Sequence, residues 1–191
     1  MSYMFFGCGN IKTIILPDDL TFIDSYQFAY CSSLTGISIP ASVTTIGEDA
    51  FEICMSLEEI TIPADVTSIG YNAFSCSGLK KVKSLMQTPC AISSNVFENV
   101  YSNATLYVHE DSKAAYKTAD YWKDFKEIAT LSIERGDANG DYTINTADIM
   151  EIKNFILGNP SDKFIEETAD ANNDGVVNVA DIVTIINIIP K

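Results

Sequence analysis

Apolar side chains recur with a period of about 23 residues through the first two thirds of the chain, a length found among structural repeats. Prolines and phenylalanines mark this spacing most clearly, at Pro17, Pro40 and Pro63 and at Phe28, Phe51 and Phe74. One unit reads F-x-x-C-x-x-L-x-x-I-x-I-P-x-x-V-T-x-I-G-x-x-A. Self-similarity at a fixed period is typical of repeat architectures, in which each repeat is one small structural unit.

Each unit predicts one short β-strand. In the stretch L-x-x-I-x-I the last two apolar residues alternate with a polar one, as on a strand with one buried face. Proline follows and ends the strand, because it cannot donate a hydrogen bond to a ladder. No unit can bury its apolar face alone, so neighbouring units must stack. We therefore expect a solenoid whose strands form a short parallel sheet. The regular pattern loosens after about residue 80, where Ser84 replaces the last strand hydrophobe.

The cysteines follow the same repeat. Cys8, Cys31 and Cys54 occupy the same position in successive units, and Cys76 comes one position early in the next. Free cysteine is commonly a small buried hydrophobe. The column therefore favours buried thiols, although disulfides remain the alternative.

A different pattern governs residues 130–191. Two stretches, beginning at Asp137 and Asp170, carry oxygen-bearing side chains at positions 1, 3, 5, 9 and 12. The first has Asp137, Asn139, Asp141, Asn145 and Asp148, with Thr143 at position 7. The second has Asp170, Asn172, Asp174, Asn178 and Asp181, with Val176 at position 7. This spacing lets a 12-residue loop wrap a calcium ion, with position 7 offering its backbone carbonyl. The sequence predicts two calcium ions; the alternative is two turns that only cap helices.

The surroundings of these loops distinguish them from ordinary EF-hands. Apolar helical segments follow them at 148–157 and 181–189, but Gly136 stands where an entering helix would precede the first loop. Position 6, usually glycine, is Gly175 in the second loop and Tyr142 in the first. A left-handed tyrosine costs about 1–2 kcal/mol, so we expect the first site to be the weaker. Alternatively, Gly140 absorbs the turn.

Composition and charge narrow the function. Hydrophobic residues make up 47% of the 191, which is enough to bury a core, and the net charge is −14. So acidic a chain is not expected to bind nucleic acid. No apolar run approaches the roughly 18 residues of a membrane helix. His109 is the only histidine. No catalytic sequence context surrounds it or the nearby Cys90 and Asp111, so we expect no enzyme.

The repeat unit resembles the BspA-like branch of bacterial leucine-rich repeat proteins, with close matches at 47–54 and 70–74. The resemblance implies an α/β leucine-rich repeat solenoid over 1–129, closed by a C-terminal cap over about 85–129 that includes Trp122 and Phe125. It also implies extracellular or bacterial cell-surface binding and adhesion, without catalysis. The solvent-facing strand positions are candidates for contact with a host protein or glycan: Ser38, Glu59, Thr61, Lys81 and Lys83.

The paired loop-helix segments resemble a type I dockerin, whose pattern is G-D-x-N-x-D-G-x-x-N-x-x-D. The resemblance implies a small α-helical calcium-binding domain over 130–191 that binds a protein partner, with a cohesin-like module as the candidate. Clostridial dockerins contact cohesin through a Ser-Thr-like pair at loop positions 10 and 11. The corresponding candidate contact residues here are Thr146, Ala147, Val179 and Ala180. Because neither loop has a Ser-Thr-like pair at these positions, the sequence argues against cohesin binding of the clostridial kind.

Three hypotheses follow. The first is a secreted or surface repeat protein that binds a ligand and uses its calcium module for assembly. The second is a structural repeat module in which calcium only stabilises the C-terminal domain. The third, an intracellular calcium sensor, predicts glutamate at loop position 12, where both loops have aspartate. Residues 128–135 lack a Gly/Pro/Ser linker, which favours packed domains. The first residues already lie inside a repeat, so we expect the chain to lack its true N-terminus.

Overall fold

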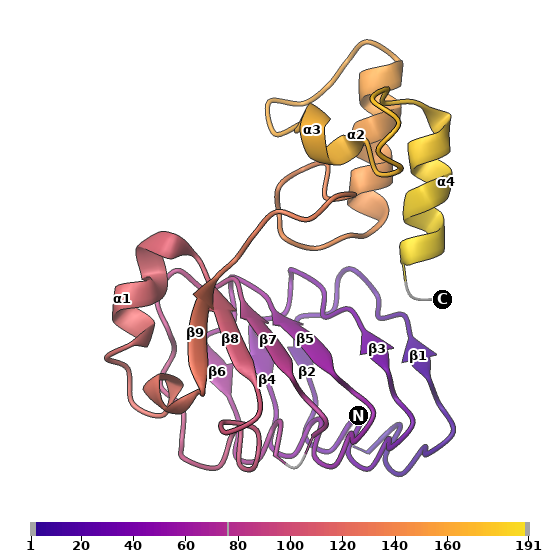
Figure 1. Cartoon of the computed structure of the whole chain (residues 1–191). Helices are drawn as coiled ribbons and strands as arrows, with labels where there is room; N and C mark the ends of the chain where they lie inside the picture. Colours follow the sequence, from indigo (N-terminus) through magenta and orange to yellow (C-terminus); the bar gives the residue numbers. More distant parts are fainter. Residues whose placement is uncertain (1–2, 76, 190–191) are drawn as a thin grey trace. The chain divides into compact units, whose positions relative to one another are not determined.

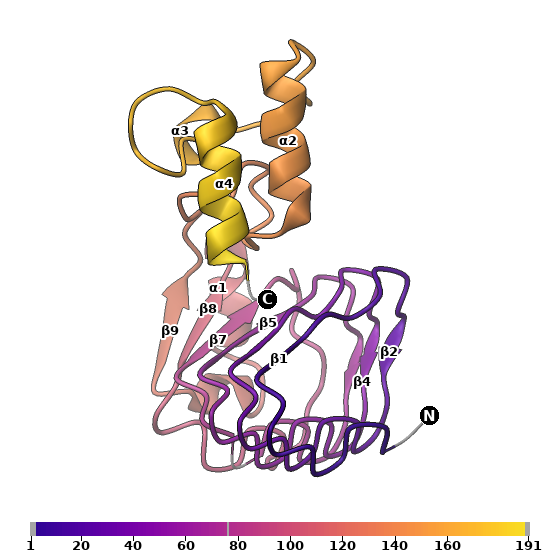
Figure 2. The ribbon, with the colours of Figure 1, turned by 90° about the vertical axis from the view of Figure 1, so that its right-hand side faces the viewer.

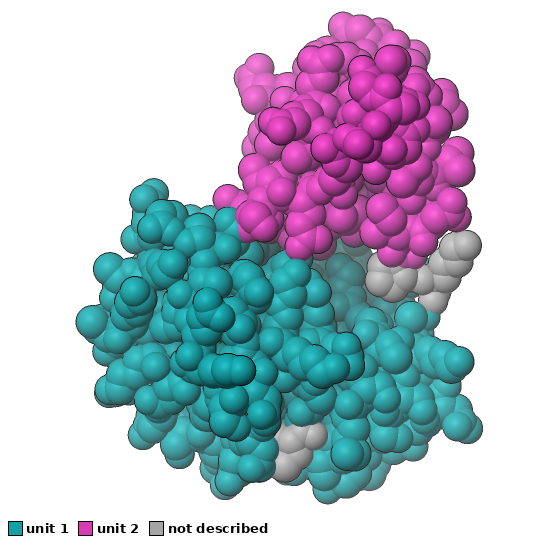
Figure 3. Space-filling model, in the orientation of Figure 1, with its two compact units in different colours: residues 1–131 teal, residues 132–191 magenta. Residues whose placement is uncertain are grey.

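The computed structural model describes residues 3–75 and 77–189 and divides the chain into two compact units, 1–131 and 132–191 (Figure 3). The division falls slightly beyond the predicted boundary at 129/130. The architectures of the two units are the predicted ones, a parallel-sheet solenoid followed by a small helical domain.

Unit 1 is a coil whose strands lie on two opposite sides (Figures 1 and 2). One side carries β1 (Thr13–Ile14), β3 (Gly36–Ile37), β5 (Glu59–Ile62), β7 (Lys81–Ser84), β8 (Thr105–Val108) and β9 (Glu127–Thr130). The other side carries β2 (Phe22–Ile23), β4 (Thr45–Ile46) and β6 (Ser68–Ile69). All the pairings are parallel, in the orders β1-β3, β5-β7-β8-β9 and β2-β4-β6.

Strand register follows the repeat period. Ile14 pairs with Ile37 and Ile23 with Ile46, each at the same position of the next repeat. Ile60 instead pairs with Val82, one position short of the usual offset, because the intervening repeat is shorter by one residue. The shortened segment includes Cys76, which lies outside the described residues.

A column of stacked phenylalanines fills the centre of the coil. Neighbouring rings in the series Phe5, Phe28, Phe51, Phe74 and Phe97 have centroids 5.5, 5.3, 5.4 and 5.1 Å apart and lie nearly parallel. The rings from Phe28 onward are at most 1% exposed. This phenylalanine column therefore continues through Phe97, beyond the point where the sequence pattern loosens.

The turns that carry these rings share an unusual backbone. The residue two positions before each ring is left-handed at Tyr3, Tyr26, Asp49 and Asn72, with φ of 69, 61, 53 and 54°. Two positions after the ring, Gly7, Tyr30 and Ile53 are left-handed as well. Since β-branched residues rarely adopt positive φ, the stacking of neighbouring turns must hold Ile53 in this conformation.

The cap closes the last turn with aromatic residues. It contains short helical segments, η1 (Glu110–Ser112), α1 (Lys113–Tyr116) and η2 (Trp122–Asp124). Tyr116 and Trp122 are fully buried, and the Trp122 indole N–H donates to the Cys90 carbonyl at 2.8 Å. Ser84, which interrupts the strand pattern, is fully buried and hydrogen-bonds the Tyr116 hydroxyl at 2.6 Å. The cap thus satisfies the polar residue that breaks the repeat.

The cysteines of unit 1 are free thiols where the structure describes them, at Cys8, Cys31, Cys54 and Cys90. Cys31 donates to the Phe5 carbonyl at 3.1 Å, and Cys54 donates to the Phe28 carbonyl at 3.2 Å. Each of these two thiols thus bonds the preceding turn, which explains its place in the repeat.

Unit 2 is built from α2 (Thr146–Ile156), α3 (Glu166–Ala169) and α4 (Val179–Ile188). The two longer helices lie side by side (Figures 1 and 2). Its core is small, with fully buried Ala138, Ile152, Ala169 and Ile185. Phe155 stacks on Phe164 with ring centroids 4.5 Å apart. The short α3, which runs directly into the second loop, was not foreseen from the sequence.

Candidate metal-binding loops

In the first loop, the carboxylates at positions 1 and 12 both accept backbone N–H groups. Asp137 accepts from Gly140 at 2.7 Å, Asp141 at 3.1 Å and Tyr142 at 2.8 Å. Asp148 accepts from Ala138 at 2.8 Å and from Asn145 at 2.8 Å. Both carboxylates are fully buried. The loop is thus wound around two buried acidic side chains.

The second loop repeats this arrangement. Asp170 accepts from the backbone of Asp174 at 3.0 Å and of Gly175 at 2.9 Å. Asp181, which is fully buried, accepts from Asn172 at 3.2 Å and Asn178 at 2.8 Å. The two loops therefore adopt matching hydrogen-bond patterns at corresponding positions.

Positions 3 and 5 also interact in the same way in both loops. The Asn139 amide donates to the Asp141 carboxylate at 3.0 Å, and the Asn172 amide donates to Asp174 at 2.9 Å. Asp141 and Asp174 also accept the backbone N–H at position 7, from Thr143 and Val176, each at 2.9 Å. Both aspartates are exposed.

Each loop contains two left-handed residues, at positions 4 and 6. The first loop uses Gly140 (φ 72°) and Tyr142 (φ 65°), and the second uses Asn173 (φ 61°) and Gly175 (φ 86°). Both sequence alternatives for the first loop therefore occur together. Each loop has one glycine, but the other left-handed residue differs. Asparagine tolerates this conformation better than tyrosine, so the first loop has the more strained backbone.

Helix capping, the alternative explanation of the loops, accounts for only part of the pattern. Asn145 caps the N-terminus of α2 and accepts the Ala147 N–H, while the Asp148 side chain accepts the Asn145 N–H. Asn178 and Asp181 form the same capping box at α4. Capping employs positions 9 and 12. It gives no reason for the acidic and amide residues at positions 1, 3 and 5.

The donor set fits a hard cation such as calcium, which prefers carboxylate, amide and carbonyl oxygens. In the chain as described, no three His, Cys, Asp or Glu side chains converge as a metal cluster. In the first loop, for example, the carboxylates accept hydrogen bonds from backbone N–H groups. The other oxygens expected to bind calcium are side-chain amide and backbone carbonyl oxygens. In both loops, the residues at positions 1, 3, 5, 7, 9 and 12 would bind the calcium ion.

Among the described residues, no Lys or Arg side chain pairs with the buried carboxylates of the first loop. The pKa of Asp148 is raised to about 6, mainly by burial and also by the neighbouring Asp141 and Asp137 charges, against the opposing hydrogen bond from the Asn145 N–H. Burial also raises the pKa of Asp137, opposed by the backbone N–H of Tyr142. A divalent cation would supply the missing charge and favour the ionised carboxylates.

The candidate partner-contact residues lie at the exposed starts of the two helices. Thr146, Ala147, Val179 and Ala180 are all exposed. Further along α4, Val183 and Ile186 are 53% and 46% exposed, and Val179 is 61% exposed. On α2, Met150 is 49% exposed. Apolar side chains thus extend from the predicted positions along the helix surfaces.

The repeat-face candidates lie on the predicted strands but interact largely with one another. Glu59 contacts Lys83 at 3.0 Å and Lys81 at 3.6 Å. Lys81 also lies over the Tyr107 ring, 5.3 Å from its centroid. Ser38 is exposed and Thr61 is half-buried. Lys83 is only 8% exposed, against the expectation of a solvent-facing side chain, because it runs along the sheet to Glu59.

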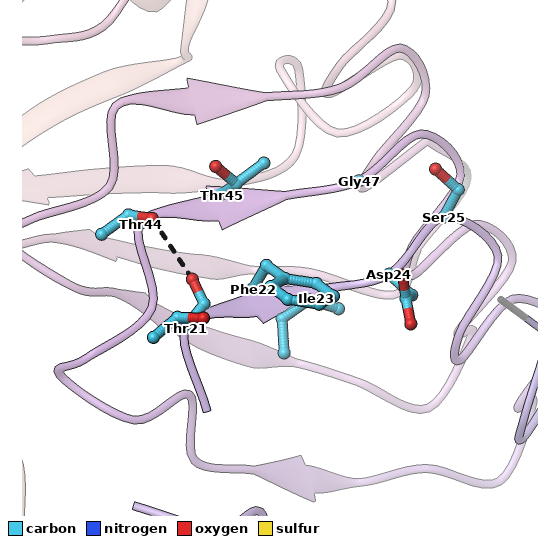
Figure 4. A pocket seen from close by; sticks show the side chains of 8 residues that line it. All are labelled: Thr21, Phe22, Ile23, Asp24, Ser25, Thr44, Thr45 and Gly47. Atoms are coloured by element: carbon cyan, nitrogen blue, oxygen red, sulfur yellow. Dashed lines mark hydrogen bonds between the residues drawn. The ribbon is translucent and has the colours of Figure 1, made fainter. Parts of the chain in front are cut away.

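A shallow hollow on the other side of the coil was missed by sequence reasoning. Figure 4 shows it along β2 and β4, with Thr44 bonded to Thr21 on the preceding turn. Asp24 and the half-exposed Phe22 both line it. The signal available in the sequence was Phe22 itself, a large apolar residue at a strand position facing away from the core. His109 is half-buried, and its ring nitrogen lies 3.2 Å from the Leu85 carbonyl.

Comparison with known proteins identifies both parts. Residues 1–119 match the BspA type leucine-rich repeat region in six copies. The chain belongs to this family. Residues 135–189 match the dockerin type I domain, so the BspA-type repeats are joined to a type I dockerin-like domain. Dockerin type I domains in general bind calcium and mediate protein–protein interaction, typically with cohesins.

Two solved structures with TM-scores above 0.5 support the fold of the repeats. The T. pallidum leucine-rich repeat protein is 21% identical, with a TM-score of 0.54, over 80% of this chain and 73% of its own. The pneumococcal vaccine antigen PcpA is 20% identical, with a TM-score of 0.52, over 69% of this chain and 38% of its own. A Bacteroides ovatus leucine-rich repeat protein is 23% identical, with a TM-score of 0.44, over 68% of this chain. The chain spans only 28% of that relative's length.

No curated protein matched the chain. Both matched families are typically non-catalytic binding modules of secreted or cell-surface proteins. Among the described helices, none combines the length and apolar character that a membrane crossing requires. A protein-interaction or surface module is therefore the class to which this chain is assigned.

Proposed function

We propose that this chain is a non-catalytic, extracellular or cell-surface binding protein whose dockerin-like unit binds two calcium ions and attaches it to a protein partner. The observation that carries the proposal is the matched pair of loops. Residues at the same loop positions adopt the same hydrogen-bond pattern around the aspartates at positions 1 and 12, of which Asp137, Asp148 and Asp181 are fully buried. Two capped helices alone do not require this duplication of positions 1, 3 and 5.

The helix surfaces support a protein partner. On α4, the side chains of Val179, Val183 and Ile186 are each about half exposed. Asp181, the one acidic residue of this helix, is fully buried. Residues 176–189 carry no other charge. An uncharged apolar surface of this kind suits a dry interface core. A cohesin-like module is the proposed partner class. In the second loop, positions 10 and 11 are Val179 and Ala180 instead of a Ser-Thr-like pair. These residues favour a cohesin whose contact surface is apolar rather than hydrogen-bonding.

Calorimetric titration of the full chain with calcium tests the metal proposal. The expected stoichiometry is two ions, and Asp141→Ala and Asp174→Ala are each expected to reduce it to one. A stoichiometry of zero would contradict the proposal.

Binding to a panel of immobilised cohesin modules in calcium tests the partner proposal. Val183→Lys is expected to weaken capture by ten-fold or more, because it places a charge in an apolar contact. Asn159→Lys, an exposed change of equal charge outside the helix surface, is the matched control. Calcium binding without capture by any cohesin would instead favour a unit that calcium only stabilises.

A further inference from the structure

The two loops of unit 2 hold one another through a reciprocal pair of side-chain contacts. The Thr168 hydroxyl donates to the backbone carbonyl of Asp137 at 2.5 Å. The Arg135 guanidinium donates to the backbone carbonyl of Asp170 at 2.9 Å. Thr168 and Arg135 each lie two positions before position 1 of their own loop. Each side chain therefore fixes the position-1 residue of the other loop.

Backbone hydrogen bonds join the same two segments. The Gly136 N–H donates to the Thr168 carbonyl at 2.7 Å, and the Ile165 N–H donates to the Ala138 carbonyl at 2.8 Å. Ala138 and Ala169 are both fully buried where these segments pack. The start of the first loop and α3, which leads into the second loop, therefore form one connected piece of structure.

The two contacts differ in charge. Thr168 is neutral, whereas Arg135, the only arginine of the chain, also lies 3.8 Å from the Asp170 carboxylate. Its charge offsets part of the negative charge at position 1 of the second loop. The Thr168 hydroxyl, by contrast, acts only through hydrogen bonds, to the Asp137 carbonyl and, at 3.3 Å, to the Ile165 carbonyl. Its removal therefore changes the connection without changing the charge of either loop.

From this arrangement we propose that the two calcium sites are positively coupled through the Thr168 and Arg135 contacts. An ion in one loop orders Asp137 or Asp170, and the exchanged contact then orders the position-1 residue of the other loop. The second ion therefore loses less conformational entropy on binding. Filling one loop is expected to raise the affinity of the other about five-fold or more, and the effect is reciprocal. The inference rests on the proposed calcium binding.

A calcium titration of the full chain followed by NMR measures this coupling directly. The amide resonances of Gly140 and Gly175 report the first and the second loop separately. Loop affinities are compared between the unaltered chain and variants in which the opposite loop is disabled, Asp141→Ala for the first loop and Asp174→Ala for the second. Both side chains are exposed, so these changes spare the core. The ratio of affinities is the coupling factor, expected to be about five or more.

Thr168→Val tests the contact itself, because valine keeps the side chain's shape and removes the hydroxyl. The coupling factor is expected to fall toward one, with a similar fall in Arg135→Gln. Thr184→Val is the matched control, since the Thr184 hydroxyl bonds only its own helix, at the Ala180 carbonyl. A merely structural role for Thr168 would lower both affinities and leave the factor unchanged, which would overturn the proposal.

The unaltered chain also gives a test that needs no variant. A Hill coefficient above one supports coupling. Two ions that bind independently overturn the coupling while leaving the calcium proposal intact. Absence of any binding overturns both.

Discussion

Single residues in the solenoid are determined by their column in the repeat rather than by local preference. Phe51 illustrates this, because its ring lies between Phe28 and Phe74 and is fully buried. Ser84 shows the complementary case, in which a polar residue in an apolar column is satisfied by the Tyr116 hydroxyl of the cap. A side chain's stability contribution therefore depends on the turns above and below it.

Replacing the central ring is expected to be costly. Phe51→Ala should lower the free energy of unfolding of unit 1 by about 3–5 kcal/mol, through lost burial and the cavity left between two rings. Urea unfolding followed by fluorescence of Trp122, the only tryptophan, reports this unit specifically. Tyr71→Ala, at a side chain 56% exposed, is the control and should cost far less. Equal losses of stability in the two variants would contradict a stabilising role of the phenylalanine column.

The buried thiol column predicts low reactivity. Burial raises the pKa of Cys54 to about 12, so very little thiolate exists near neutral pH. In the folded chain, iodoacetamide at about pH 8 should modify Cys54 far more slowly than in urea. Mass spectrometry of digested samples measures the two rates. Native labelling of Cys54 at the unfolded rate would show that the turn opens.

Among the elements, close stacking of turns places demands that no isolated strand would make. A Cβ added at Gly70 would lie 2.5 Å from the Glu48 backbone nitrogen, and one added at Gly47 would meet the Ser25 nitrogen at the same distance. These glycines let neighbouring turns approach to a spacing that a methyl group would prevent. The constant spacing of the turns therefore follows from backbone contact as well as from stacking of the phenylalanine rings.

Gly70→Ala is therefore expected to destabilise unit 1 by about 2–3 kcal/mol, since backbone must shift to relieve the contact. Gly9→Ala is the matched control. Its added Cβ would meet the Ser32 hydroxyl oxygen at 3.4 Å, an ordinary contact, and the change should be near neutral. Urea midpoints of the two variants, again from Trp122 fluorescence, make the comparison. Similar midpoints would show that the turns can separate without cost.

Much of this element-level structure could be predicted from the sequence, because stacked repeats and loop ligands both leave fixed spacings. The solenoid, the parallel sheet and the helices after each loop follow from such spacings. Phe97 was predictable too, one repeat period after Phe74, but the irregular segment between them obscured it. Lys83 could not be placed, because its burial depends on an ion pair with Glu59 of the neighbouring strand. The Thr168 and Arg135 contacts depend on how the two loops meet in space.

At the scale of the whole molecule, the two units differ in what stabilises them. Unit 1 has a continuous core from Leu16 to Phe125, whereas the fully buried apolar core among the described residues of unit 2 consists of Ala138, Ile152, Ala169 and Ile185. Unit 2 also buries the carboxylates of Asp137, Asp148 and Asp181. A small core surrounding buried acidic groups should depend strongly on a bound cation. Ligand at about 1,000 times its dissociation constant contributes about 4 kcal/mol, a large share of such a unit's stability.

The most direct test of this account is differential scanning calorimetry of the full chain, in millimolar calcium and in chelator. We expect two transitions in calcium. The transition of unit 2 should move to much lower temperature in chelator, while that of unit 1, followed in parallel by Trp122 fluorescence, stays in place. The double variant Asp148→Asn/Asp181→Asn should show little response to calcium. Transitions that are the same in calcium and in chelator would contradict the central claim that these loops bind calcium and that unit 2 depends on it.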